Sequence, residues 1–421
     1  MLLASTIKRH ALEVGFDLVG IAPPSALKDL EFLPQWIKKG FSGEMRYLAD
    51  PRREDPSRVL PSVKSIICVG LIYNTPHPYS TDVFETAEDG SVQPLGGTLP
   101  KRVQPRAWIS RYAWGKDYHD LIRGKLEQLR VAVEELTPNV ETRVYVDTGP
   151  VMERAFARLT GIGWMGKNTC LINEQKGSWF FLGVIFTNLE MKLDLPAPDR
   201  CGSCTRCLEA CPTGALVEPY VMDASRCISY FTIELRGTIP EEFRTAIGKN
   251  IFGCDICQDV CPWNSRPLSA FSGPLHEDGL RKDATGAGPT QRNVATTDLP
   301  EFQPLQLEIE SIAEPAVDDE PAHQLSSTEQ FSLFNPTLEN LASITEEDFK
   351  RVLARSPIKR AKYRGWLRNL CVVMGNSGDR QFIPWLEAAA GSQDPLVREH
   401  AAWALGRLQG GVQSPHNRQW G

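Results

Sequence analysis

Two closely spaced groups of cysteines constrain this chain more than any other feature. Residues 201–212 have the full C-x2-C-x2-C-x3-C-P spacing of bacterial ferredoxins. Residues 254–262 form a second run that lacks its first cysteine, and the lone Cys227 is the natural substitute. In two-cluster ferredoxins the fourth cysteine of each run ligates the other cluster. The spacing therefore predicts two [4Fe–4S] clusters, one bound by Cys201, Cys204, Cys207 and Cys261, the other by Cys211, Cys227, Cys254 and Cys257.

A zinc site is the main alternative, but zinc needs no crossed-over, proline-terminated pattern. The first residues carry charges where a signal peptide has its apolar centre. We therefore expect a cytoplasmic protein, and eleven cysteines in such a chain favour metal ligation in a reducing compartment over disulfides. The cysteines outside the two runs lie among apolar neighbours and are expected in the core; they are Cys68, Cys170 and Cys371.

The length of 421 residues is sufficient for two or three domains. Apolar and charged contents of 42% and 23% are typical of soluble globular proteins. The net charge of -6 gives no global reason to expect a nucleic-acid partner, so any such site must be a local patch. The longest apolar run, residues 179–186, is too short for a membrane helix. We expect no membrane contact and a monomer.

The pattern of apolar residues predicts four parts. Residues 1–195 alternate strand and helix patterns, with strands at 65–73 and 179–186 and a helix at 118–136, which indicates a mixed α/β domain. Residues 85–105 are expected to form a surface loop. The remaining parts are the cysteine-rich domain at 196–265, an extended and partly disordered linker at 266–335, and a helical domain at 336–421.

The helical domain contains two similar segments and a basic cluster. Residues 368–375 align with residues 399–406, and the pair resembles short HEAT-type repeats. Residues 350–368 contain eight Lys or Arg and no acidic residue. Charge runs usually form solvated helix faces, but such faces normally mix signs. The unmixed cluster therefore favours a contact with a nucleic-acid phosphate backbone.

Three further segments are candidates for chemistry. Asp147 follows a predicted strand, where it serves either as a catalytic carboxylate or as a helix cap. Residues 161–169 are glycine-rich and can approach a large cofactor, although they match neither a P-loop nor a dinucleotide fingerprint. His119 begins like the D-x-H-x-x-G motif of some cobalamin proteins, but Ile122 replaces the glycine. We therefore interpret His119 as structural.

Together these segments resemble epoxyqueuosine reductase, a cobalamin-dependent family that modifies tRNA. The resemblance rests on the cysteine cassette with Cys227, residues 111–119, 146–149 and 226–229, and the basic tail. It implies a nitroreductase-like cobalamin domain, a ferredoxin-type insert and a tRNA-binding helical tail. Asp147 matches the family's proton donor. Positions matching its cobalamin-lining stretches are Arg53, Ser110, Asp147, Lys167, Asn168, Ser229, Asp255 and Ile256. The expected tRNA contacts are Lys359, Arg360, Lys362, Arg364 and Arg368.

The resemblance also implies a reaction, with the anticodon stem-loop of tRNA as partner. Electrons from an external donor pass singly through the clusters to cobalamin, and the epoxide oxygen of epoxyqueuosine leaves as water. Asp147 protonates that oxygen, for which burial against the corrin raises the pKa of its carboxyl. The rivals are a reductive dehalogenase-like cobalamin enzyme and a ferredoxin-like electron carrier. The dehalogenase needs no cationic tail, and the carrier needs no large α/β domain.

Overall fold

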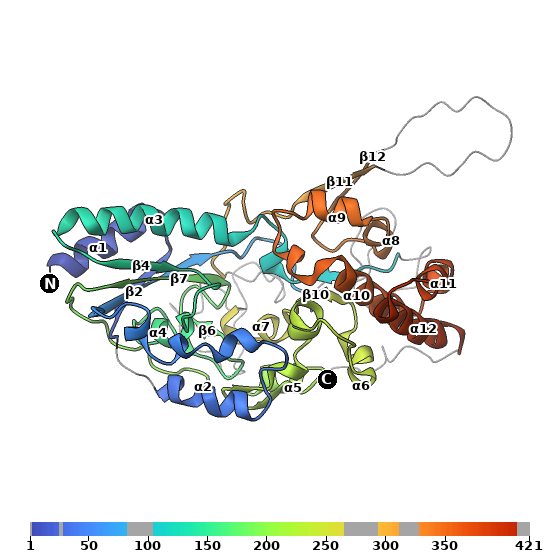
Figure 1. Cartoon of the computed structure of the whole chain (residues 1–421), viewed down its shortest axis with the longest axis horizontal. Helices are drawn as coiled ribbons and strands as arrows, with labels where there is room; N and C mark the ends of the chain where they lie inside the picture. The colour runs from blue at the N-terminus through green and yellow to red at the C-terminus, as the bar shows by residue number, and fades with distance from the viewer. Residues whose placement is uncertain (1, 25–27, 82–103, 265–293, 311–327, 411–421) are drawn as a thin grey trace, which may run out of the picture. The chain divides into compact units, whose positions relative to one another are not determined.

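The computed structural model describes residues 2–24, 28–81, 104–264, 294–310 and 328–410 (Figure 1). The chain divides into two compact units whose segments alternate along the sequence. The first unit comprises Met1–His77, Tyr118–Ser225 and Ile256–Leu299, and the second comprises Pro78–Asp117, Arg226–Asp255 and Pro300–Gly421. The four contiguous domains expected from the sequence stay a prediction. Within the described ranges, no helix is long and apolar enough to cross a membrane.

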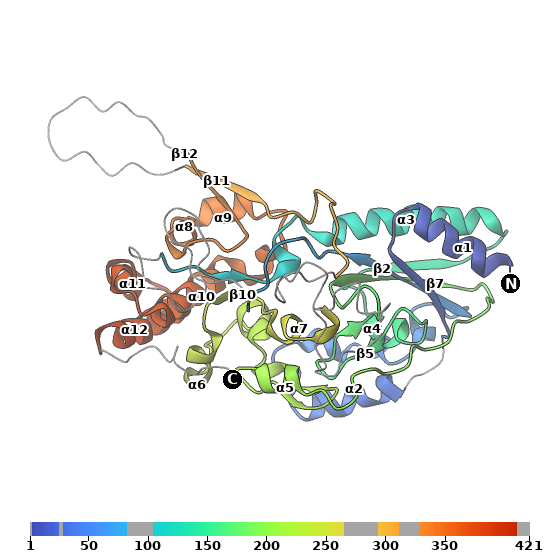
Figure 2. The ribbon, with the colours of Figure 1, turned by 180° about the vertical axis from the view of Figure 1, so that it is seen from behind.

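The first unit is built on a four-stranded sheet in the order β1-β2-β7-β4, with every neighbouring pair antiparallel. Helices α1 and α3 cover one face and α4 lies on the other, as both views show (Figures 1 and 2). The strands are β1 Leu18–Ala22, β2 Ser65–Ile72, β4 Thr142–Tyr145 and β7 Phe180–Thr187. The helices are α1 Leu2–Glu13, α2 Lys28–Lys38, α3 Tyr118–Leu136 and α4 Glu153–Ala157.

The apolar patterns explain this arrangement. Every residue of β2 is buried, because both faces of the sheet are covered. Helix α3 packs closely on β7 at Gly183, where an added Cβ would lie 2.8 Å from Leu126. On the opposite face, Phe156 of α4 packs with Ile66 and Val184. The predicted helix at 118–136 and both predicted strands are confirmed, the second shifted by one position.

The cysteine-rich segment contributes short elements to the first unit. Helix α5 contains Cys207 and helix α7 contains Cys257, and the two helices pack against each other. Strands β8 and β9 of this segment pair with each other, and strands β5 and β6, which precede the segment, form a second small antiparallel ladder. These elements are α5 Arg206–Ala210, α7 Ile256–Asp259, β5 Trp164–Met165, β6 Leu171–Ile172, β8 Leu216–Glu218 and β9 Val221–Met222.

The second unit is mainly helical. Its long helices α10 and α12 pack so closely that a Cβ on Gly375 would lie 2.9 Å from the Cα of Ala404. The helices are α6 Glu241–Arg244, α8 Leu338–Ala342, α9 Glu346–Val352, α10 Lys362–Ser377, α11 Ile383–Ala390 and α12 Pro395–Gln409. The strands are β3 Trp108–Ile109, β10 Asn250–Phe252, β11 Gln306–Glu310 and β12 Thr328–Ser332.

Part of the expected linker is ordered structure. Strands β11 and β12 pair in antiparallel register, and Leu307, Ile309 and Phe331 are buried. The prediction of an extended linker throughout 266–335 is therefore wrong for these strands, because alternating apolar residues bury one face of the pair. Most of the predicted loop at 85–105, and residues 265–293 and 311–327, lie outside the described residues.

Candidate active site

Asp147 lies just beyond strand β4 on a loop of residues 146–152, which we call the Asp147 loop. Its backbone is left-handed, with φ at 50°, a conformation in which Asp is enriched among non-glycine residues. The Tyr118 hydroxyl donates a 2.7 Å hydrogen bond to the Asp147 carboxylate, and the His119 Nε2 lies 3.4 Å from the same oxygen. The Asp147 side chain is nevertheless 55% exposed. It is thus both oriented by its neighbours and accessible to a substrate.

The two aromatic neighbours are fixed by stacking at the start of α3. The Tyr118 ring lies 3.9 Å from the Phe181 ring at an interplanar angle of 10°, and 4.1 Å from the His119 ring at 25°. The sequence pattern did not identify Tyr118 as a site residue, and it indicated a structural role for His119. One feature of the sequence could have indicated these residues. Tyr118 and His119 are adjacent polar aromatic residues at the N-terminus of a predicted amphipathic helix.

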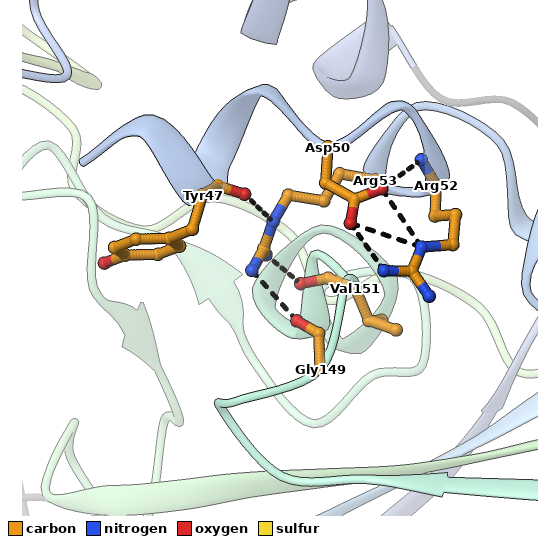
Figure 3. Close-up of polar contacts among 6 residues, drawn as sticks. All are labelled: Tyr47, Asp50, Arg52, Arg53, Gly149 and Val151. Carbon is orange, nitrogen blue, oxygen red and sulfur yellow. Dashed lines mark hydrogen bonds and ion pairs between the residues drawn. The ribbon is translucent and has the colours of Figure 1, made fainter.

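Arg53 binds the Asp147 loop through its backbone (Figure 3). Its Nη1 donates to the Val151 carbonyl at 2.7 Å and its Nη2 to the Gly149 carbonyl at 2.9 Å. Its Nε donates to the Tyr47 carbonyl at 3.3 Å, and the residue is only 8% exposed. The side chain predicted to line the cofactor is therefore engaged with the loop that carries Asp147.

Glu153 begins helix α4, at the end of the Asp147 loop. The residue is partly exposed, but its Oε1 is shielded from solvent and has no hydrogen-bond partner among the described residues. Burial of the carboxyl, assisted by the negative charge of Asp147, raises the pKa of Glu153 to about 7. Glu153 could not be identified from the sequence, because a Glu in the first turn of a helix usually interacts only with the positive end of the helix dipole.

The ligands predicted for the first cluster lie together in the first unit. Cys201 and Cys261 belong to one apolar cluster with Trp164, and the thiols of Cys201 and Cys204 act electrostatically on Cys207. Burial and neighbouring thiols raise the pKa of Cys207 to about 11 and of Cys261 to about 12. Such thiols ionise readily only when a metal binds them.

In the part of the chain that the structure describes, no three His, Cys, Asp or Glu side chains are arranged to hold a single metal ion. A cubane differs from such a site because each thiolate binds a different iron. The second predicted ligand set stays a prediction from the spacing, since Cys211 and Cys257 belong to the first unit and Cys227 and Cys254 to the second.

Cys170 differs from the other two cysteines expected in the core. Cys68 and Cys371 are fully buried, as predicted. Cys170 is only partly buried and close enough to Cys261 to raise the pKa of that thiol. The prediction of a core position is therefore wrong for Cys170, because its thiol lies near Cys261 in the cysteine loops (residues 201–211 and 257–261) and is only partly covered.

Lys167 and Asn168, predicted to line cobalamin, contact the cysteine loops. The Lys167 ammonium donates to the Gly202 carbonyl at 2.6 Å and the Cys204 carbonyl at 2.9 Å. The Asn168 amide donates to the Cys257 carbonyl at 3.1 Å. Both residues are at least nine-tenths buried. Their polar atoms therefore stabilise the two loops from which predicted cluster ligands extend.

The remaining predicted cofactor residues lie in both units. In the second unit, Ser110 donates a 2.5 Å hydrogen bond to Asp255, which also accepts from the Trp108 indole and the Arg111 amide. Asp255 is buried, and burial raises the pKa of its carboxyl. Ser229 of the second unit and Ile256 of the first are partly exposed.

The basic cluster has acidic partners from distant parts of the sequence. In the second unit, Lys359 pairs with Asp117 at 2.7 Å, Arg360 with Glu234 at 2.6 Å, and Arg364 with Asp394 at 2.5 Å. The unmixed charge of the sequence is thus mixed in space. In each pair the cation is at least 37% exposed, whereas the acid is less exposed and Asp117 is buried.

Lys362 and Arg368 are the two extremes of the cluster. Lys362 is exposed and forms no ion pair with a described residue. Arg368 is 1% exposed and donates to the backbone carbonyls of Phe231, Leu235 and Gly237. The prediction that Arg368 contacts tRNA is therefore contradicted, because its guanidinium is buried and its donors are used within the protein.

This chain is similar to known proteins over nearly its whole length. Residues 200–264 match a 4Fe-4S double cluster binding domain, and residues 53–148 match the family described as epoxyqueuosine reductase QueG, DUF1730. An epoxyqueuosine reductase from Xanthomonas campestris is 35% identical over 405 residues, covering 96% of this chain and 95% of the relative.

Two solved structures are also similar. An epoxyqueuosine reductase with an epoxyqueuosine-modified tRNA-Tyr stem loop matches with a TM-score of 0.71 and 28% identity, over 97% of this chain and 90% of the other. The Bacillus subtilis enzyme, solved with its catalytic aspartate loop swung out of the active site, matches with a TM-score of 0.71 and 27% identity over the same shares.

The mixed α/β architecture and the double-cluster domain define the class of this protein, an iron–sulfur oxidoreductase. Identity above 30% over nearly the whole length then specifies the family. The chain belongs to the epoxyqueuosine reductases.

Proposed function

We propose that this protein reduces epoxyqueuosine to queuosine in tRNA. The observation that supports this most strongly is an exposed carboxylate, Asp147, held by Tyr118 within the same compact unit as the cysteine loops. Removing an epoxide oxygen as water and leaving a double bond requires two electrons and two protons. Clusters bound by the predicted cysteines would supply the electrons singly, and Asp147 supplies one of the two protons, to the oxygen that leaves.

The iron–sulfur ligands are the two sets predicted from the spacing. Cys201, Cys204, Cys207 and Cys261 bind the first cluster, a set supported by their mutual proximity. Cys211, Cys227, Cys254 and Cys257 bind the second, a set supported by the match to a double-cluster domain.

The residues of the first unit also fit a bound cobalamin. Corrin side arms end in amides, which can donate to the exposed Asp147 carboxylate, and the partly exposed Ile256 stays a predicted contact. Tyr118, Phe181 and Tyr73 form an aromatic cluster, in which both tyrosines are buried, that fixes the side of the site where Asp147 lies. Bound cobalamin supplies a cobalt centre that accepts single electrons and delivers two. Arg53, Lys167 and Asn168 support this site indirectly, through the loops that they bind.

Within this reaction each residue of the Asp147 site has a distinct task. Asp147 protonates the epoxide oxygen. Tyr118 orients the carboxylate and, with His119, lies where it can return a proton to Asp147 after turnover. The Asp147 loop corresponds to the catalytic aspartate loop of the Bacillus subtilis relative, and we propose that it likewise adopts a docked and a released position.

The second unit binds the tRNA anticodon stem-loop. Lys359, Arg360, Lys362 and Arg364 contact phosphates, with Lys362 the most available of the four. A similar protein has been solved with a tRNA stem loop. Helices α10 to α12 would serve as a HEAT-like support, and the first unit as a nitroreductase-like catalytic part. The protein acts as a cytoplasmic monomer that receives electrons from an external donor.

Anaerobic incubation with cobalamin, a chemical reductant and tRNA containing epoxyqueuosine tests this function. Nucleoside mass spectrometry is expected to show the loss of one oxygen atom from the modified base. The reductive dehalogenase alternative predicts an unchanged nucleoside and halide release from organohalides. The electron-carrier alternative predicts neither reaction and no corrinoid absorption bands in the purified protein.

A further inference from the structure

We propose that Arg53 is a positioning residue that holds the Asp147 loop in its docked conformation. This inference rests on the proposed function only for the role of Asp147; the hydrogen bonds themselves do not depend on it. Figure 3 shows the guanidinium of Arg53 directed at two carbonyls of the loop, Gly149 and Val151.

The Asp147 loop has little other backbone support. Among the described residues, the main chain of residues 149–151 forms no backbone–backbone hydrogen bond, and Pro150 has no N–H to donate. The carbonyls of Gly149 and Val151 accept from Arg53 instead. Hydrogen bonds from a charged donor are stronger than neutral ones. Arg53 is therefore the main polar link between this stretch and the rest of the unit.

Arg53 is committed to these carbonyls and to no carboxylate. It is 8% exposed, and no described acidic residue forms an ion pair with it. A buried guanidinium is costly unless its donors are satisfied, and here backbone carbonyls satisfy them. Lys cannot replace this arrangement fully, because its ammonium is a point donor without the planar fork that spans two separate carbonyls.

The segment that presents Arg53 is itself fixed. Asp50 caps the turn Pro51–Arg53 by accepting from the Arg52 amide, and it also binds the Arg52 guanidinium at 2.7 Å. This contact with Arg52 lowers the pKa of Asp50 to about 2, so the cap stays ionised at physiological pH. The Tyr47 ring lies 5.7 Å from the Arg53 guanidinium.

The consequence concerns the position of Asp147. Its left-handed backbone persists only where neighbouring structure enforces it. Without Arg53 the loop loses two charge-assisted hydrogen bonds, and the released position gains population. Because proton transfer requires close alignment, a displacement of about 1 Å can reduce a rate roughly 100-fold.

The test compares Arg53→Met and Arg53→Lys with Arg58→Met, an exposed arginine on the following turn whose only described ion pair is 3.8 Å long. In anaerobic hydrogen exchange, the peptide spanning residues 146–153 of Arg53→Met is expected to exchange at least about tenfold faster. Iron content and the unfolding midpoint should stay near wild type, because release of the loop exposes the Gly149 and Val151 carbonyls to water, unlike the carbonyls that Arg368 binds within packed helices. Arg53→Lys should be intermediate and Arg58→Met unchanged.

The kinetic readout uses the reconstituted enzyme with modified tRNA. Arg53→Met is expected to lower kcat roughly 100-fold without changing KM for tRNA. Unchanged exchange in the 146–153 peptide would overturn the proposal, as would a loss of iron or a global fall in stability, which would indicate a purely structural role. If the wild type has no activity but Arg53→Met shows the local increase in exchange, the proposed function fails and the positioning role stands.

Discussion

Tyr118 links helix α3 to the Asp147 carboxylate on the neighbouring loop, and deleting the phenolic oxygen of Tyr118 removes this contact. Tyr118→Phe deletes the hydrogen bond to Asp147 and keeps the stacked ring. A hydrogen bond to a charged group contributes about 1.5–3 kcal/mol, so we expect a decrease in kcat of roughly 10- to 100-fold with both clusters retained. Single-turnover kinetics measure the change, and Tyr363→Phe in the second unit is the matched control.

Glu153 makes the stability of the first unit depend on pH. Its pKa is about 7 in the folded protein, against a usual value of 4.5. Below pH 4.5 the carboxyl is neutral in both states. Between pH 4.5 and about 7 only the unfolded state ionises, so stability falls as pH rises, by up to about 3 kcal/mol. Glu153→Gln should remove this loss and gain stability over wild type at pH 8 but not at pH 4.5.

Anaerobic denaturant unfolding of both forms at the two pH values measures this difference. Subtracting the unfolding free energy of wild type from that of the variant at each pH cancels any pH dependence that the clusters contribute to both. An equal effect of Glu153→Gln at both pH values would show that the carboxyl titrates normally in the folded state.

Among the helices and strands, the pattern of apolar residues correctly predicted those elements whose formation depends on local sequence. The apolar periodicity of α3 and the continuous apolar run of β2 were sufficient to place both elements. The predicted strand before Asp147 is confirmed, but catalytic groups are expected at strand ends in parallel sheets, and this sheet is antiparallel. The catalytic role of Asp147 therefore stays a prediction. The acidic partners of Lys359, Arg360 and Arg364 could not be predicted, because tertiary packing brings them from distant segments.

Arg368 of helix α10 was expected on the surface from its place in the basic cluster, but it is buried and stabilises the fold. Arg368→Met would leave the carbonyls of Phe231, Leu235 and Gly237 without their donor. Buried acceptors that lose a charged donor cost about 2–4 kcal/mol. We expect that loss of stability in chemical denaturation, and a change below about 0.5 kcal/mol for the exposed Lys362→Met. Similar values for the two variants would contradict the burial of Arg368.

Lys362, whose replacement should hardly affect stability, is expected to affect RNA binding. Because no described acid pairs with it, Lys362→Ala should weaken binding of the anticodon stem-loop and reduce the slope of log affinity against log salt by about 1. Arg364→Ala should have a smaller effect, since Arg364 is already paired with Asp394. Fluorescence anisotropy over a range of salt concentrations measures both slopes. Equal slopes in wild type and Lys362→Ala would make this surface an ordinary solvated one.

For the protein as a whole, the cysteine spacing and the family motifs identified the class. The two compact units could not be predicted, because each is made of three segments that are separated in the sequence. Each unit contains segments from before and after the cysteine runs, and no pattern of residues along the sequence marks where the chain passes from one unit to the other. The tasks of Arg53 and Lys167 were also invisible in the sequence, because each side chain binds backbone carbonyls and not a partner with a recognisable residue type.

One comparison of wild type with Asp147→Ala tests the account of this enzyme as a cluster-fed reductase with a dedicated proton donor. Both proteins are loaded with iron, sulfide and cobalamin, reduced, and mixed once with tRNA containing epoxyqueuosine, and nucleoside masses are followed with time. We expect equal cluster and corrinoid spectra, rapid loss of one oxygen in wild type, and almost none in Asp147→Ala. Equal rates of oxygen loss in the two proteins, or none in wild type, would contradict the account.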